Sequence, residues 1–90
     1  MPARTLTVTH EVGLHARPAA TFVKTASPYP CEITIRNMTA GSEPVNAKSI
    51  LSVLTLGVNQ GHEVEIAAEG EQAEDALDAL AQLIESNFGE

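Results

Sequence analysis

The sequence predicts an α+β fold, an open-faced β-sandwich in which three helices cover one face of a four-stranded antiparallel sheet. Three segments alternate apolar and polar side chains with a period of two, which is typical of strands buried on one face only. Three other segments carry apolar side chains at helical spacing. The resulting order is β-α-β-β-α-β-α, and strands with one apolar face require every helix to lie on that side. A chain of 90 residues predicts a single domain, residues 1–90.

The first strand and the first helix come from the N-terminal third of the chain. The segment reading RTLTVTH places Leu6 and Val8 on one side and threonines on the other. Apolar residues then recur at helical spacing from Pro18 onward, which predicts a helix over residues 16–27. The two prolines of the following SPYP end this helix, because proline cannot continue it.

The middle of the chain predicts a hairpin with a short second arm. Residues 31–36 alternate, with Cys31, Ile33 and Ile35 pointing inward. A turn-rich stretch containing Gly41 and Pro44 follows them. The short arm after this turn is expected to be an edge strand.

The second half of the chain predicts a short helix, the last strand and a longer helix. The short helix begins near Ser49 and ends before Gly57, a residue type that readily takes the backbone conformation found after a helix. Residues 62–70 alternate once more, and residues 71–88 carry a single apolar stripe. Acidic residues in the first turns of this last helix interact favourably with its dipole.

Charge and composition restrict the partners and the compartment. Five Lys and Arg against 12 Asp and Glu give a formal net charge of −7, which repels nucleic acid and anionic lipid. No apolar run approaches the about 20 residues of a membrane span, and the start of the chain lacks the apolar region of a secretory signal. Cys31 is the one cysteine, so the chain forms no internal disulfide. We therefore expect a cytoplasmic protein that binds no nucleic acid and inserts into no membrane.

The hexapeptide GLHARP at residues 13–18 predicts an anion site at the start of the first helix. His15 falls at or near the N-cap, and Ala16 and Arg17 follow in the first turn. Their backbone N–H groups have no carbonyl four residues earlier to bond, so they point toward an anion at the positive end of the helix dipole. Pro18 fits this turn, where a missing N–H costs little. Arg17 adds a permanently charged fork that suits phosphate oxygens.

The second helix carries more apolar surface than one sheet can cover. Val53 and Leu56 lie together on one side, whereas three further apolar residues spread over the other side. Neighbouring loops could cover this surplus, or it could form an exposed patch for partner proteins. The three residues are Ile50, Leu51 and Leu54.

The other histidines predict no metal site. The segment HEVGLH is similar to a zinc-protease motif, but its histidines are five residues apart and Gly13 interrupts any helix between them. We expect no metal and no other cofactor. His10 and His62 flank strand ends beside polar residues and are expected to be solvated without partners, and Cys31 is expected to be a small core residue.

Two long segments together resemble the HPr family, the histidine-containing phosphocarriers of the bacterial phosphoenolpyruvate-dependent sugar phosphotransferase system. They are GLHARPAATFVKTAS and NAKSILSVLTLGVNQGHEVEIAAEGEQAEDAL, and the likeness covers nearly the whole chain. The resemblance implies that His15 takes a phosphoryl group on Nδ1 from enzyme I and passes it to enzyme IIA domains. It implies that Arg17 neutralises charge during this transfer, and that the protein is a monomeric carrier without enzymatic turnover of its own.

The resemblance also gives the second helix a role. Ser49 matches a serine that a dedicated kinase, opposed by a phosphorylase, modifies in many relatives. Ile50, Leu51 and Leu54 match the apolar surface that relatives present to enzyme I and IIA domains. A phosphate on Ser49 would add about two negative charges beside that surface and so block acidic partners. The stretch NMTAGSEP is longer than is usual in the family.

Two alternatives belong to other classes. One is a regulatory relative that serves a nitrogen-related or dihydroxyacetone branch, or that acts through Ser49 as the partner of a repressor. Relatives of the repressor-partner kind lack the histidine, whereas this chain retains His15. The other is a small-molecule-binding regulatory domain, which only the fold class favours.

Overall fold

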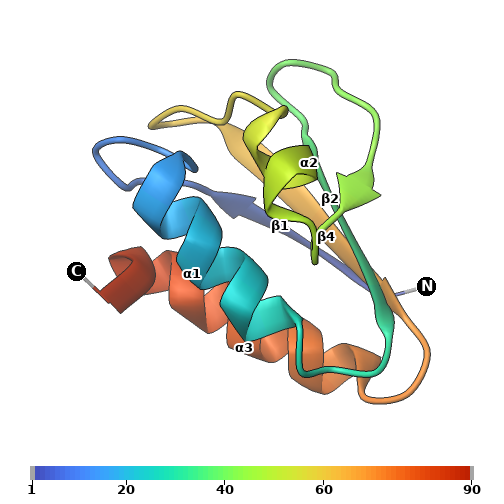
Figure 1. The fold of residues 1–90 in the computed structure, drawn as a ribbon. Helices are drawn as coiled ribbons and strands as arrows, with labels where there is room; N and C mark the ends of the chain where they lie inside the picture. Colours follow the sequence, from blue (N-terminus) through green and yellow to red (C-terminus); the bar gives the residue numbers. More distant parts are fainter. Residues whose placement is uncertain (1, 90) are drawn as a thin grey trace.

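The computed structural model describes residues 2–89 and has the predicted order of elements (Figure 1). A single 3-10 turn, Asn87–Gly89, follows the last helix. The strands and helices are β1 (Ala3–Thr7), α1 (Ala16–Ala26), β2 (Glu32–Asn37), β3 (Val45–Asn46), α2 (Ile50–Leu54), β4 (Glu63–Glu69) and α3 (Ala73–Glu85).

The four strands form one antiparallel sheet in the order β1-β4-β2-β3. The register pairs Leu6 with Val64 and Ile35 with Ile66, so the inward side chains of the period-two pattern meet on one face. Helices α1 and α3 run side by side across that face, and α2 lies beyond α1 over the other end of the sheet (Figure 1). The predicted α+β open-faced β-sandwich is therefore confirmed.

The core fills the space between this face and the helices. Its largest fully buried side chains come from both long helices and from the sheet. They include Phe22 of α1, Leu77 and Leu80 of α3, and Ile33 and Ile66 of the sheet. Burying a side chain of this size contributes about 1.5–3 kcal/mol. Cys31 is buried among these residues, as predicted for a small core residue.

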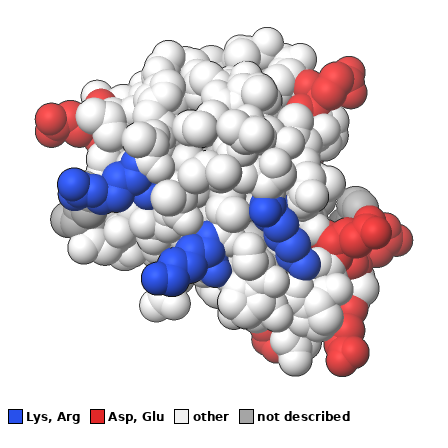
Figure 2. Space-filling model, viewed as in Figure 1, with Lys and Arg blue, Asp and Glu red and all other residues white. Residues whose placement is uncertain are grey.

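Charged side chains are segregated over the surface. Residues 13–30 and 44–62, which include α1 and α2, hold three of the five Lys and Arg residues and none of the 12 Asp and Glu residues. Figure 2 shows Lys and Arg side chains across this face and Asp and Glu side chains at its margins. The helical face over α1 and α2 is therefore locally basic, although the whole chain is acidic.

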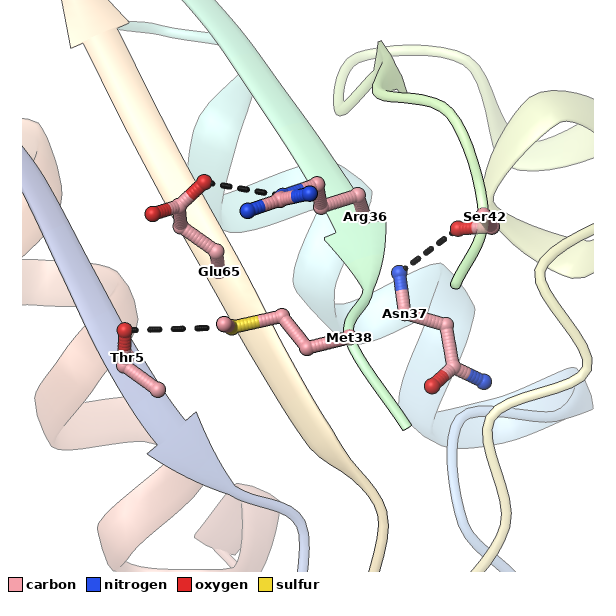
Figure 3. Close-up of polar contacts among 6 residues, drawn as sticks. All are labelled: Thr5, Arg36, Asn37, Met38, Ser42 and Glu65. Carbon is pink, nitrogen blue, oxygen red and sulfur yellow. Dashed lines mark hydrogen bonds and ion pairs between the residues drawn. The ribbon is translucent and has the colours of Figure 1, made fainter. Parts of the chain in front are cut away.

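The opposite face of the sheet carries no helix and is polar. Arg36 Nε donates to Glu65 Oε1 at 2.9 Å between neighbouring strands, and the Thr5 hydroxyl donates to Met38 Sδ at 3.9 Å across β4 (Figure 3).

Arg4 makes an ion pair with Asp78 on α3 at 2.8 Å. The hydrogen bond to the Asp78 carboxylate is the main reason that the pKa of the Arg4 guanidinium is raised.

The ends of α2 and α3 show where the local sequence pattern was and was not sufficient. Ser49 caps α2 as predicted, because its Oγ accepts from the Ser52 N–H at 3.3 Å, and Gly57 adopts a φ of +59° after the helix. The last helix is shorter than the predicted 71–88. It begins after Gln72, whose φ of +64° is incompatible with a helix, and it ends at Glu85.

No helix within residues 2–89 is both long enough and apolar enough to cross a membrane.

Candidate functional site

Two distant segments meet at the start of α1. The Leu14 N–H donates to the Val58 carbonyl at 2.9 Å. Gly13 makes this approach possible, because a Cβ at its position would lie only 2.3 Å from that carbonyl oxygen. Gly13 also has a φ of +70°, which other residues rarely adopt. The contact places Asn59 beside His15.

His15 is the N-cap residue of α1, as predicted. Its backbone is extended, its side chain makes no capping hydrogen bond, and its carbonyl accepts from the Ala19 N–H at 2.7 Å. The exposed ring instead places Nε2 3.0 Å from Asn59 Oδ1. Ala16 and Arg17 are exposed in the first turn beside it. The structure thus brings together the three residues that the sequence predicted for an anion site.

A hollow of about 660 Å³ adjoins this helix start, and residues 10–12 and Asn87 line its other side. The expectation that His10 is solvated is wrong. His10 is buried, its Nδ1 accepts from the Val12 N–H at 3.2 Å, and its ring packs edge-on against Phe88 with centroids 5.6 Å apart. The 3-10 turn after α3 supplies both Phe88 and the lining residue Asn87, so the C-terminal end of the described chain forms part of the wall.

The expectation that His62 has no partners is also wrong. Its Nδ1 accepts from the Asn59 backbone N–H at 3.2 Å and from Asn37 Nδ2 at 3.1 Å. Asn37 is fully buried and also donates to the Leu56 carbonyl at 3.1 Å. Because both partners of this ring nitrogen are donors, His62 carries its proton on the other nitrogen. The side chains of Asn37 and His62 thus tie the end of β2 to the segment that carries Asn59.

This arrangement suits a phosphoryl group on His15. A neutral imidazole has one unprotonated nitrogen, which is a nucleophile. A helix start favours a negative group through its unpaired N–H donors and its dipole, and each such interaction contributes about 0.3–1 kcal/mol. Arg17 places a guanidinium in the same turn.

The second predicted feature, the surplus apolar surface of α2, is exposed. Val53 is fully buried and Leu56 is 7% exposed, so they form the core side of this segment. The other side is not covered by loops. Its residues are Ile50, Leu51 and Leu54, which are 39%, 75% and 37% exposed. We call these three residues the α2 patch, and α2 lies in contact with α1.

Three polar residues of the site could not be selected from the sequence alone. Asn59 lies in a polar loop, and only its turn composition is visible from the sequence. Asn37 continues the inward side of β2, where the period of two predicts an apolar residue. His62 acquires its partners from these two residues. Two of their contacts join positions that are 25 and 44 residues apart in the chain.

Comparisons with known proteins identify the family of this chain. A family model described as "PTS HPr component phosphorylation site" matches residues 2–86. The phosphocarrier protein HPr of Pseudomonas putida is 42% identical over 90 residues, covering all of this chain and 98% of the relative. A crystal structure of HPr-C-His from Thermoanaerobacter tengcongensis superposes with a TM-score of 0.93 at 47% identity, covering 100% of this chain and 98% of that chain.

A second kind of relative is much longer. The multiphosphoryl transfer protein of Haemophilus influenzae is 43% identical over 86 residues, which are 96% of this chain but only 17% of that protein. The same sequence pattern therefore occurs as a separate carrier and as one part of a larger protein.

The fold and these matches define a phosphoryl-carrying protein of a transfer relay. The chain belongs to the HPr family, the phosphocarriers of the phosphotransferase system. It is accordingly a carrier in the pathway that couples phosphoryl transfer to sugar uptake, and it has no enzymatic turnover of its own.

Proposed function

We propose that His15 is the residue that carries the phosphoryl group, accepting it from phospho-enzyme I and passing it to enzyme IIA domains. The observation that supports this assignment is the exposed His15 ring at the start of α1, next to Arg17 and to the first-turn amides. His10 is buried and His62 is engaged by two donors, so neither offers a comparable nucleophile.

The transfer begins with the neutral ring. The lone pair of Nδ1 attacks the phosphorus, a nitrogen–phosphorus bond forms, and the bond from phosphorus to the donor breaks with its electron pair leaving on the donor. The oxygens of the bound group then meet the N–H groups of Ala16 and Arg17 and the guanidinium of Arg17. Their stabilisation is moderate, which allows the group to leave again. Interactions that hold the loaded state as strongly as the transition state would not speed onward transfer.

The α2 patch is proposed as the surface that docks enzyme I and IIA domains. It combines exposed apolar side chains with the basic surroundings of α1 and α2, which suits partners that are acidic around an apolar centre (Figure 2). Ser49 immediately precedes the patch and is proposed as a site of regulatory phosphorylation by a kinase. A phosphate there would reverse the local charge and oppose docking. This role assigns the protein to the cytoplasm, where such partners and phosphoenolpyruvate occur.

Phosphorylation with purified enzyme I and phosphoenolpyruvate tests the assignment of His15. We expect the intact protein to gain the mass of one phosphoryl group, and the His15→Ala variant to gain none. Ser49→Ala is the matched control, because it removes the other proposed phosphorylation site and should still gain one group. An His15→Ala protein that gains the group under these conditions would show that another residue is the carrier.

A further inference from the structure

Asn59 presents its side-chain oxygen to the ring that we propose is phosphorylated. Its Oδ1 lies 3.0 Å from His15 Nε2, although the two residues are 44 positions apart. An amide oxygen is only an acceptor, so the ring nitrogen facing it is the one that carries a hydrogen. A neutral imidazole has one hydrogen on its two nitrogens, and the lone pair therefore lies on Nδ1.

The position of Asn59 is fixed from both sides of its loop. Its backbone N–H donates to His62 Nδ1 at 3.2 Å, and the preceding Val58 carbonyl accepts from the Leu14 N–H at 2.9 Å. His62 is in turn held by the buried Asn37. The side chain of Asn59 is thus presented to the ring by a backbone that hydrogen bonds hold in place. Such outer partners determine the tautomer and orientation of functional histidines in many sites.

We propose that Asn59 is a positioning residue for phosphoryl transfer, which holds the His15 ring in the tautomer with its hydrogen on Nε2 and its lone pair on Nδ1. The proposal rests on the proposed function of His15. Nδ1 is bonded to the ring carbon that carries the side chain, so it is the nitrogen nearer to the backbone at the start of α1. The selected tautomer therefore directs the nucleophilic nitrogen toward the amides that would receive the phosphoryl oxygens.

The hydrogen bond also persists through the reaction. When Nδ1 forms its bond to phosphorus, the hydrogen on Nε2 stays in place and the ring becomes positively charged as the donor departs with its electron pair. A donor that becomes charged makes a stronger hydrogen bond to the same acceptor. Asn59 therefore stabilises the transition state more than the ground state, which is the requirement for a faster transfer.

The Asn59→Ala variant tests this role, with Gln60→Ala as the matched control. Gln60 is the neighbouring exposed amide, but its side chain donates to the Thr9 carbonyl and not to the His15 ring. Both changes leave the backbone N–H of residue 59 free to donate to His62. Nitrogen NMR of the unphosphorylated proteins reports which ring nitrogen carries the hydrogen, and a rapid-mixing assay with enzyme I and phosphoenolpyruvate reports the transfer rate.

We expect Asn59→Ala to lower the ratio of the Nε2–H tautomer to the other by about two- to tenfold and to slow phosphorylation by a similar factor through kcat. Gln60→Ala should match the wild type in both measurements. Asn59→Asp keeps an acceptor at the same place and should preserve the tautomer ratio of the wild type. A purely structural role for Asn59 would leave the tautomer ratio unchanged.

An Asn59→Ala protein with the tautomer ratio or the transfer rate of the wild type would overturn the proposal. The two measurements also distinguish a failure of the Asn59 proposal from a failure of the proposed function of His15. The NMR comparison needs no phosphoryl donor, so it decides whether Asn59 holds the ring. Failure of the wild-type protein to accept any phosphoryl group would overturn the assignment of His15 as the carrier instead.

Discussion

Gly13 and Gly41 have the same φ of +70° but different surroundings, and this difference separates two effects of glycine. At both positions another residue would adopt a strained backbone, at a cost of about 1–2 kcal/mol. Only at Gly13 would an added Cβ also collide with the 58–59 backbone, whereas nothing lies within 4 Å of the corresponding position at Gly41. The close contact that positions Asn59 beside His15 thus depends on one missing methyl group.

Alanine substitutions at these two glycines measure the contribution of that contact. We expect Gly41→Ala to lower the free energy of unfolding by about 1–2 kcal/mol and Gly13→Ala by about 2–5 kcal/mol, because overpacking adds about 1–3 kcal/mol to the strain. Urea unfolding of the two variants and the wild type gives these values directly. Equal losses at the two positions would contradict the tight approach of the 58–59 segment. We also expect only Gly13→Ala to slow phosphorylation of His15.

The three histidines differ in how far their surroundings could be predicted from the sequence. The N-cap position of His15 was predictable, because it depends on the adjacent glycine, proline and apolar helical spacing. The burial of His10 was not, because it depends on Phe88 at the other end of the chain. The buried partner of His62, Asn37, likewise comes from β2, 25 residues away. Local patterns carry no information about such long-range contacts.

Elements were more predictable than their ends. The period of two identified β1, β2 and β4, since each strand is buried on one face only. The start of α3 was placed too early, because Gln72 takes a left-handed backbone that its residue type does not indicate. The surplus apolar arc of α2 was visible in the sequence, but its exposure needed the structure, which shows that no loop covers it.

The cap of α2 gives a prediction for Ser49. Ser49→Ala removes the acceptor for the Ser52 N–H and should lower the free energy of unfolding by about 1 kcal/mol. Ser49→Asp keeps a capping acceptor and should unfold near the wild-type midpoint. Its negative charge beside the α2 patch should nevertheless lower kcat/KM for phosphorylation by enzyme I by at least about fivefold.

Thermal or urea unfolding and the enzyme I assay test the two halves of this prediction separately. If Ser49→Asp and Ser49→Ala were phosphorylated on His15 equally well, charge at this helix start would not influence docking. The stability prediction would be unaffected by that result, because the cap is a property of the isolated chain.

The α2 patch gives a second prediction about this helix. Leu51 is 75% exposed, so Leu51→Gln should change stability by less than about 0.5 kcal/mol. It should still lower kcat/KM for phosphorylation by enzyme I by about fivefold or more, because an apolar contact at the centre of a docking surface is lost. Met38→Gln is the control, since Met38 is an exposed apolar residue on the polar face of the sheet.

Kinetics with purified enzyme I distinguish the two surfaces. The Met38→Gln protein should be phosphorylated within about twofold of the wild-type rate. A reduction of the same size in both variants would indicate that the α2 patch has no special part in docking.

The whole molecule separates its charges in a way that suits a carrier. The region of α1 and α2 carries only basic residues, and acidic side chains lie at the margins of this face (Figure 2). Other acidic residues belong to β2, β4 and α3. An excess negative charge on the remaining surface favours solubility, and it orients an acidic partner toward the basic face during encounter. The site histidine and the α2 patch both lie on elements of that face.

The same distribution predicts that the protein is a monomer. The uncovered sheet face is lined by polar and charged side chains such as Thr5, Arg36 and Glu65. Of the two edge strands, β3 has only two residues, and β1 carries the charged side chain of Arg4. A short edge, a charged edge residue and a charged face all oppose pairing with a second copy. The exposed apolar α2 patch is small and lies among like charges, so two copies would repel each other on docking there.

Sedimentation velocity should therefore give the mass of one chain over a wide range of concentration, with no change in Leu51→Gln. A mass that rises with concentration in the wild type but not in Leu51→Gln would show that the α2 patch binds a second copy, and self-association would then compete with the docking of enzyme I.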